Sequence, residues 1–76
     1  MPHVLLKLAS GRTDAQKTAI AGALTQALIA TAGCTEDDVS VGIEDVDPKQ
    51  WVEAVYKPDV LGKPGTLFKQ PGYDPL

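Results

Sequence analysis

The first apolar segment of the chain is short and alternates in the manner of a β-strand. Over residues 3–9 (HVLLKLA), Val4, Leu6 and Leu8 face one way, and Leu5 makes the opposite face partly apolar as well. Alternation of this kind predicts a strand. A strand that is apolar on both faces has to be covered twice, and one helix can cover only one of the two faces.

A longer segment with helical spacing follows a turn at residues 10–12. Thr13 and Gln16 have the spacing of a capping box, in which two side chains bond each other's backbone at the start of a helix. Gly33 is well placed to end that helix. Its predicted apolar stripe, at three- and four-residue spacing, consists of Ile20, Ala23, Leu24, Ala27, Leu28 and Thr31. The alanine content of the stripe predicts close packing on a sheet.

A second alternating segment predicts a second strand. Val39, Val41 and Ile43 alternate with polar or small residues. They follow an acidic turn at residues 35–38, which we expect to be exposed to solvent rather than to bind calcium. A helix between two strands is the usual crossover of a parallel pair. The predicted fold class is therefore α/β (α+β), with one β-α-β domain over residues 1–76.

The rest of the chain predicts a short helix and an irregular tail. Asp47 and Pro48 suit the N-cap and the first position of a helix, which we expect to run through about Tyr56. From Lys57 onward, repeated proline and glycine exclude a long regular element. The apolar side chains of this tail are expected to pack on another part of the protein, and a partner subunit is a good candidate. Because two strands and one main helix cannot close a core, we predict a homo-oligomer, a dimer or larger.

Composition narrows the classes of partner. The 76 residues include 7 Lys and Arg against 10 Asp and Glu, a formal charge of −3, which argues against binding to nucleic acid. The single cysteine, Cys34, and the only histidine, His3, form no cluster with metal-ligand spacing, and we interpret His3 as a strand residue. No secretory signal is recognisable, and the longest apolar-rich stretch, residues 19–32, is too short to span a bilayer. We expect a cytoplasmic protein without a metal, in keeping with the lone free cysteine.

The group with the most distinctive chemistry is the nitrogen of Pro2, which follows Met1. A small residue in second position lets methionine aminopeptidase remove Met1, and Pro2 would then carry a free secondary amine. An α-amino group has a reference pKa of roughly 7.7–8.0, and burial or a nearby cation lowers that pKa toward neutrality. Such an amine could act as a general base at neutral pH. The plain alternative is that proline is tolerated at the start of a chain.

Three features in order along the chain resemble the 4-oxalocrotonate tautomerase family of the tautomerase superfamily. They are Pro2 at the start of the first strand, residues 11–17 (GRTDAQK) at the entry to the helix, and Trp51 shortly after the second strand. Pro48, Trp51 and residues 69–73 (KQPGY) are similar to a longer bacterial subgroup whose members are described as dimers. The resemblance therefore implies a dimer rather than a trimer or a hexamer.

The resemblance implies a cofactor-independent enol–keto tautomerase that acts on a small carboxylic acid. Pro2 matches the catalytic proline, whose neutral amine takes a proton from an enol or dienol oxygen and delivers it to carbon. Arg12 matches an arginine that binds a substrate carboxylate, a pairing suited to the two-pronged guanidinium. Trp51 matches an aromatic wall that excludes water. We expect the site to form between two subunits.

One position departs from the family pattern. Where the family has a second arginine, early in the second strand, this chain has Ser40. A hydroxyl can donate one hydrogen bond but cannot neutralise a second carboxylate, and Lys49 or Lys7 would have to compensate. A monocarboxylate enol such as phenylenolpyruvate is therefore expected to be a better substrate than a dicarboxylate such as 2-hydroxymuconate. Two alternatives stay open: a Pro2-dependent hydratase or dehalogenase, if the amine stays protonated, and a non-catalytic oligomeric binding protein of the same fold.

Overall fold

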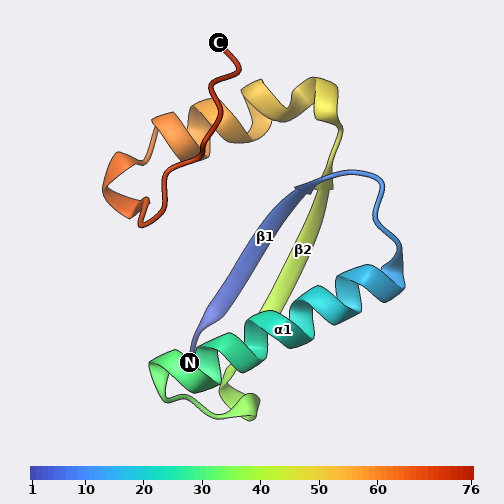
Figure 1. Cartoon of the computed structure of the whole chain (residues 1–76), viewed down its shortest axis with the longest axis vertical. Helices are drawn as coiled ribbons and strands as arrows, with labels where there is room; N and C mark the ends of the chain where they lie inside the picture. The colour runs from blue at the N-terminus through green and yellow to red at the C-terminus, as the bar shows by residue number, and fades with distance from the viewer.

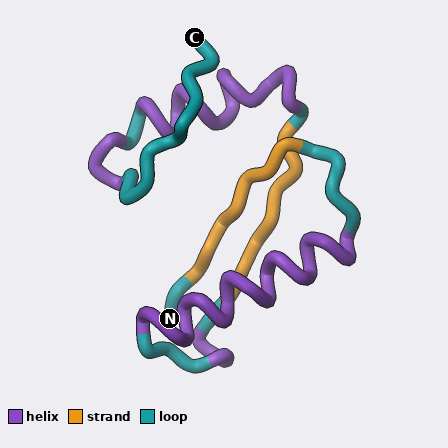
Figure 2. Tube along the Cα trace, viewed as in Figure 1, coloured by secondary structure: helices purple, strands orange, loops and turns teal.

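Two parallel strands, β1 (His3–Ala9) and β2 (Ser40–Val46), form the sheet of this protein, described over residues 1–76 by a computed structural model (Figure 1). The strands pair along their full length. Between them, α1 (Asp14–Ala32) runs from the end of β1 back toward the start of β2 and lies along the sheet (Figure 2). The predicted fold class, a β-α-β unit with parallel strands, is confirmed. No helix in the chain combines the length and the apolar character needed to cross a membrane.

Both ends of α1 are set by the residues that the sequence predicted. The Thr13 hydroxyl accepts a hydrogen bond from the backbone N–H of Gln16, and the Gln16 side chain accepts one from the N–H of Thr13. The predicted capping box is thus confirmed. At the other end Gly33 has a φ of +71°, the left-handed conformation that glycine adopts without steric cost. The capping box fixes where α1 begins, and so the length of the turn that carries Arg12.

The side of α1 that faces the sheet differs in part from the predicted stripe. Ile20, Leu24 and Leu28 are half-buried as predicted. The other three members of the stripe are exposed: Ala23, Ala27 and Thr31. The residues sheltered in their place are Ala21, Thr25 and Ile29. A sheet of two strands covers only a narrow strip of a helix, and small or apolar residues flank Leu24 on both sides, so the sequence does not show which flank is covered.

Short helical segments and an irregular tail over residues 67–76 make up the rest of the chain. One, η1 (Glu36–Asp38), lies in the acidic turn between α1 and β2 and is exposed, as predicted. Three more follow β2 as a C-terminal arm: η2 (Pro48–Gln50), η3 (Val52–Leu61) and η4 (Pro64–Thr66). The arm begins as predicted, because the Asp47 carboxylate accepts a hydrogen bond from the N–H of Lys49 as an N-cap.

The predicted end of the second helix is wrong. We expected it to stop near Tyr56, but η3 continues past Pro58 to Leu61 with the wide turns of a π-helix. In an α-helix, proline removes one hydrogen bond and its ring collides with the carbonyl of the preceding turn. The wider π turn moves that carbonyl away from the ring. η3 therefore extends five residues past the predicted end, and η4 adds a further short turn that the sequence did not predict.

The end of η3 folds back closely on itself at Gly62, where a β-carbon would lie 2.5 Å from the carbonyl oxygen of Pro58. We expect Gly62→Ala to lower the free energy of unfolding by about 1–3 kcal/mol, the usual cost of forcing extra atoms into a packed site. Urea unfolding would measure this loss. Gly65→Ala is the matched control, because a β-carbon at Gly65 would meet nothing within 4 Å. Equal stability of the two variants would contradict the expectation.

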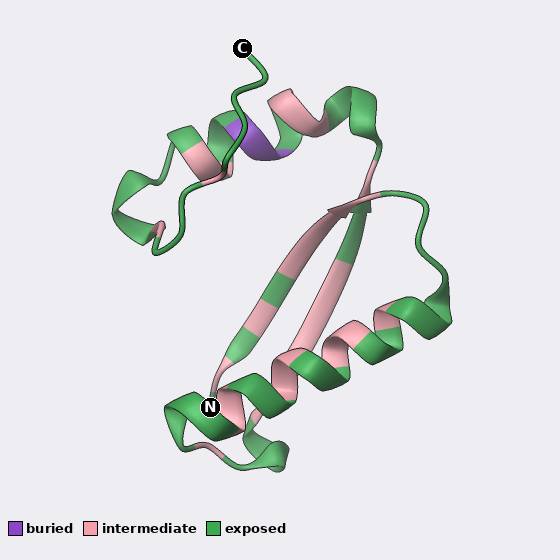
Figure 3. Cartoon of the chain, viewed as in Figure 1, coloured by how far each residue is buried: buried purple, intermediate pink, exposed green.

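One chain does not close a core. Only Val55 and Tyr56, both on η3, are buried (Figure 3). The accessible surface is 5485 Å² for a chain of 8.0 kDa, whereas a compact chain of this mass exposes about 4,450 Å². The excess, about 1,000 Å², is close to the roughly 800 Å² that one partner buries in a standard interface. The radius of gyration of 13.8 Å likewise exceeds the value of about 11.4 Å for a compact chain. This surface supports the predicted self-association.

An ion pair joins the arm to the sheet. The Lys7 ammonium on β1 donates a hydrogen bond to the Asp59 carboxylate on η3, and the Lys63 ammonium lies 3.3 Å from the same carboxylate. The hydrogen bond with Asp59 raises the pKa of Lys7, and the same bond lowers the pKa of Asp59. Both groups are therefore charged at neutral pH, and the arm is held near the later half of β1.

Candidate active site

Two of the predicted site residues lie together at the start of the strands. Pro2 directly precedes β1 and is half-buried, and its carbonyl oxygen accepts a hydrogen bond of 3.2 Å from the backbone N–H of Ser40. Met1, ahead of it, is fully exposed. The hydrogen bond holds Pro2 beside the first residue of β2, so the Pro2 nitrogen has a defined place at this end of the sheet.

The Ser40 hydroxyl is already engaged within the chain. Its Oγ lies 2.6 Å from Nδ1 of His3, in a hydrogen bond across the strand pair. His3 and Ser40 are direct register partners, so strand pairing brings them together. Sequence reasoning placed His3 on the strand but did not predict this contact, because alternation alone does not give the register between two strands. The contact holds the Ser40 side chain against His3, the residue that follows Pro2.

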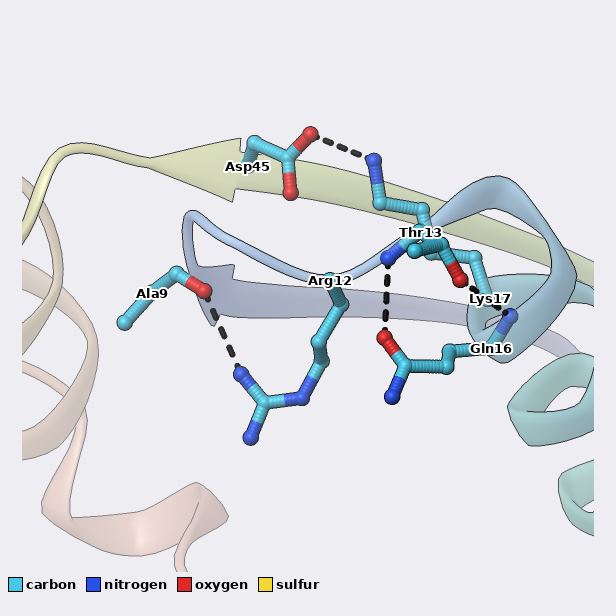
Figure 4. A network of polar contacts seen from close by, with 6 residues as sticks. All are labelled: Ala9, Arg12, Thr13, Gln16, Lys17 and Asp45. Carbon is cyan, nitrogen blue, oxygen red and sulfur yellow. Dashed lines mark hydrogen bonds and ion pairs between the residues drawn. The ribbon is translucent and has the colours of Figure 1, made fainter.

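Arg12 lies at the opposite end of β1, in the turn that leads into α1 (Figure 4). Its Nη1 donates a hydrogen bond of 3.3 Å to the carbonyl oxygen of Ala9, the last residue of β1. The neighbouring cation, Lys17, is paired with Asp45, and that hydrogen bond raises the pKa of Lys17. Arg12 has no carboxylate partner in the chain. Its remaining N–H donors are therefore available to an external anion.

A hollow of about 410 Å³ adjoins the same end of β1. This volume falls within the range of roughly 300–1,000 Å³ that is typical of ligand sites. Its lining consists of Ala9, Pro48, Trp51, Val52, Tyr73 and Pro75. Half of these residues are exposed, so the hollow is open to solvent in a single chain. Its mainly apolar walls suit an aromatic or aliphatic group better than a second carboxylate.

The tail contributes to this pocket through Tyr73, which sequence reasoning missed as a site residue. The indole Nε1 of Trp51 donates a hydrogen bond of 3.0 Å to the Tyr73 hydroxyl. The Tyr73 ring also packs on the buried Tyr56, with ring centroids 5.8 Å apart. We expected the tail to pack, with a partner subunit as a good candidate, and Tyr73 packs within its own chain. Phe68 and Leu76 remain exposed.

The four predicted site residues thus form two pairs at opposite ends of the strands. Pro2 and Ser40 lie at the start of β1 and β2, whereas Arg12 and Trp51 lie beyond the end of β1. β1 has seven residues, and a strand rises about 3.3 Å per residue, so the pairs are about 20 Å apart. A carboxylate bound at Arg12 would therefore be out of reach of Pro2 in the same chain.

The two ends of the strands carry different polar groups, Pro2 and Ser40 at one and Arg12 at the other. No group of three or more His, Cys, Asp or Glu side chains is arranged to hold a metal ion. Lys7 is paired with Asp59 and is not free to replace the second arginine. Lys49 has no ion pair and lies in η2, next to Pro48 of the pocket. The two ends therefore differ in chemistry: Pro2 and Ser40 lie at one, and the Arg12 guanidinium beside a mainly apolar pocket lies at the other.

Comparison with known proteins identifies the relatives of this chain. Residues 2–56 match a family model described as tautomerase enzyme. A probable tautomerase from Xylella fastidiosa is 37% identical over 76 residues, which cover 100% of this chain and 93% of that protein. A tautomerase named PptA from Klebsiella pneumoniae is 40% identical over 96% of this chain and 97% of its own. Among solved structures, one from the 4-oxalocrotonate tautomerase isozymes of Methylibium petroleiphilum matches with a TM-score of 0.63 at 36% identity, covering 66% of this chain and 81% of that chain.

Proposed function

Because this chain belongs to the tautomerase family and is a tautomerase, we propose that it interconverts the enol and keto forms of a small carboxylic acid with the Pro2 nitrogen as proton carrier. The observation that carries this proposal is the position of Pro2, which Ser40 holds at the start of β1 behind the exposed Met1. Removal of Met1 leaves a secondary amine at a fixed place on the sheet. The non-catalytic binding role considered from the sequence does not fit a match to an enzyme family.

The proposed reaction moves one proton. The neutral Pro2 amine takes the proton of the enol hydroxyl, the oxygen becomes a carbonyl as the carbon–carbon double bond becomes single, and the ammonium returns the proton to the adjacent carbon. The enol and keto forms contain the same atoms and electrons, so their interconversion requires no cofactor. While Met1 is present the Pro2 nitrogen is an amide without a basic lone pair. The mechanism therefore requires that Met1 be removed.

The active site is proposed to lie between subunits. A twofold axis that sets two chains side by side in opposite directions brings the Pro2 end of one subunit against the Arg12 end of its partner. The 5485 Å² surface, larger than that of a compact chain of this mass, supports such association. The guanidinium of the partner would also favour the neutral form of the Pro2 amine, because a nearby positive charge lowers the pKa of an amine. We propose a dimer, the smallest assembly that joins the two ends.

The proposed substrate is an aryl or similarly apolar enol with one carboxylate. Arg12 would bind the carboxylate through its fork of N–H groups beside Ala9, and the pocket around Trp51 would receive the apolar body. At the Pro2 end, the Ser40 hydroxyl is bonded to His3 and carries no charge for a second carboxylate. Phenylenolpyruvate meets these conditions, whereas 2-hydroxymuconate has a carboxylate at each end.

Ketonisation of phenylenolpyruvate, followed in the ultraviolet, tests the proposed function. Protein whose intact mass shows that Met1 is removed should catalyse the reaction well above the buffer rate. A matched protein with one additional glycine ahead of Pro2 has an acylated Pro2 nitrogen, and its kcat should fall by about 100-fold or more, the lower bound for losing a positioned acid–base group. Equal rates for the two proteins would exclude the Pro2 amine as the proton carrier.

A further inference from the structure

The side chains of the Trp51 pocket offer a ligand very few hydrogen-bonding groups. Six residues line it, and only two of them, Trp51 and Tyr73, carry a polar atom in the side chain. Indole nitrogen donates and does not accept, and the Trp51 donor is already used in its bond to Tyr73. A substrate atom in this pocket can therefore form a side-chain hydrogen bond only with the Tyr73 hydroxyl.

The direction of the Trp51–Tyr73 bond leaves the Tyr73 proton free. Since Trp51 is the donor, the phenol oxygen is the acceptor, and its own O–H must point elsewhere. No acceptor in the chain receives that proton. The Tyr73 hydroxyl is thus a hydrogen-bond donor in a pocket whose other walls are apolar.

The Tyr73 ring is held in place although it is 50% exposed. The Tyr73 hydroxyl accepts the hydrogen bond from Trp51, and the Tyr73 ring packs at an angle of 42° on the ring of the buried Tyr56. Just after Tyr73, the Asp74 carboxylate accepts a hydrogen bond from the N–H of Leu76. A donor that is positioned before the ligand arrives loses less conformational entropy on binding.

From these contacts we propose that Tyr73 is a specificity-determining residue, whose hydroxyl donates a hydrogen bond to an oxygen on the ring of an aryl enol acid. The assignment rests on the proposed function, in which Arg12 binds the carboxylate next to Ala9. Ala9 also lines the pocket, so the aryl ring extends from Arg12 toward Trp51 and Tyr73. An oxygen substituent on the ring can accept the hydrogen bond of the Tyr73 hydroxyl, whereas a bare phenyl ring offers no such acceptor. The chemical class selected is a ring-hydroxylated aryl enol monocarboxylate.

The test compares two substrates in the wild type and in Tyr73→Phe, which keeps the ring and removes only the hydroxyl. The ratio of kcat/KM for the 4-hydroxyphenyl enol acid to that for phenylenolpyruvate should fall by about threefold to tenfold in Tyr73→Phe, the usual effect of one hydrogen bond in a solvent-accessible site. The change should lie in KM for the hydroxylated substrate. Tyr56→Phe is the matched control, since Tyr56 belongs to the same aromatic cluster but does not line the pocket; its ratio should equal that of the wild type.

Two results would overturn the assignment. An unchanged ratio in Tyr73→Phe would show that the hydroxyl does not contact the ring substituent. An equal loss for both substrates would show that Tyr73 only orients Trp51. If the wild type turns over neither substrate, the proposed function has failed, and Tyr73 is then tested by binding alone. Trp51 is the only tryptophan, so its fluorescence reports titration with 4-hydroxyphenylpyruvate and phenylpyruvate, and the same ratio of dissociation constants decides the outcome.

Discussion

Replacing Pro2 by alanine is expected to lower kcat for phenylenolpyruvate by about 10²- to 10⁴-fold, the usual contribution of a positioned acid–base group. Alanine is also small, so Met1 is still removed and the variant still begins with an amine. That primary amine lacks the ring that fixes the nitrogen next to the Ser40 contact, and it rotates away from the productive direction. Steady-state rates in the ultraviolet, with the intact mass of each protein, measure the loss.

Pro64→Ala is the matched control for this loss, because Pro64 begins the exposed turn η4, remote in sequence from Pro2. It should keep the wild-type rate. Both variants should also keep the circular dichroism spectrum and the oligomer mass of the wild type. A Pro2→Ala protein as fast as the wild type would contradict the mechanism. A loss that appears only together with dissociation would assign the effect to assembly instead of proton transfer.

The parts of the fold that the sequence predicted well are those set by neighbouring residues. The capping box joins Thr13 and Gln16 across three positions, and Gly33 ends α1 through its own backbone conformation. Asp47 caps η2 in the same local manner. Such signals involve residues only a few positions apart, so they can be recognised in the sequence itself.

Contacts between distant segments were beyond this kind of prediction. The hydrogen bond between Trp51 and Tyr73 joins residues 22 positions apart. The continuation of η3 past Pro58 depends on π-helical turns, whereas a proline in the sequence predicts the end of a helix. The site shows the same limit. Pro2 and Trp51 align with a family pattern along the chain, but the parallel strand order puts them at opposite ends of the sheet. Only the topology reveals that the predicted site residues of one chain lie at opposite ends of the sheet.

Replacing Arg12 by alanine is expected to lower kcat/KM by about 10- to 150-fold, which corresponds to the roughly 1.5–3 kcal/mol of a hydrogen bond to a charged group. Arg12→Lys keeps the charge without the two-pronged geometry, so its loss should be smaller. Because Arg12 contacts only the Ala9 carbonyl within the chain, neither change should alter stability much. Lys69→Ala, at an exposed cation without an ion pair, is the control. An Arg12→Ala protein with unchanged KM and kcat would exclude Arg12 from carboxylate binding.

Pro2→Ala and Arg12→Ala chains refolded together in equal amounts are expected to regain about one quarter of wild-type activity. In a symmetric assembly with shared sites, each site takes Pro2 from one subunit and Arg12 from another. Each of these two residues is intact in half of the chains, so both are intact in about one quarter of the sites. Each variant refolded alone is the control and should stay at its own low rate. A mixture no faster than the two variants summed would place Pro2 and Arg12 of one chain in the same site, against their separation of about 20 Å along β1. The expected quarter holds for a dimer and for any larger symmetric assembly with one Pro2 and one Arg12 per site. The experiment therefore decides where the site lies before the number of subunits is known.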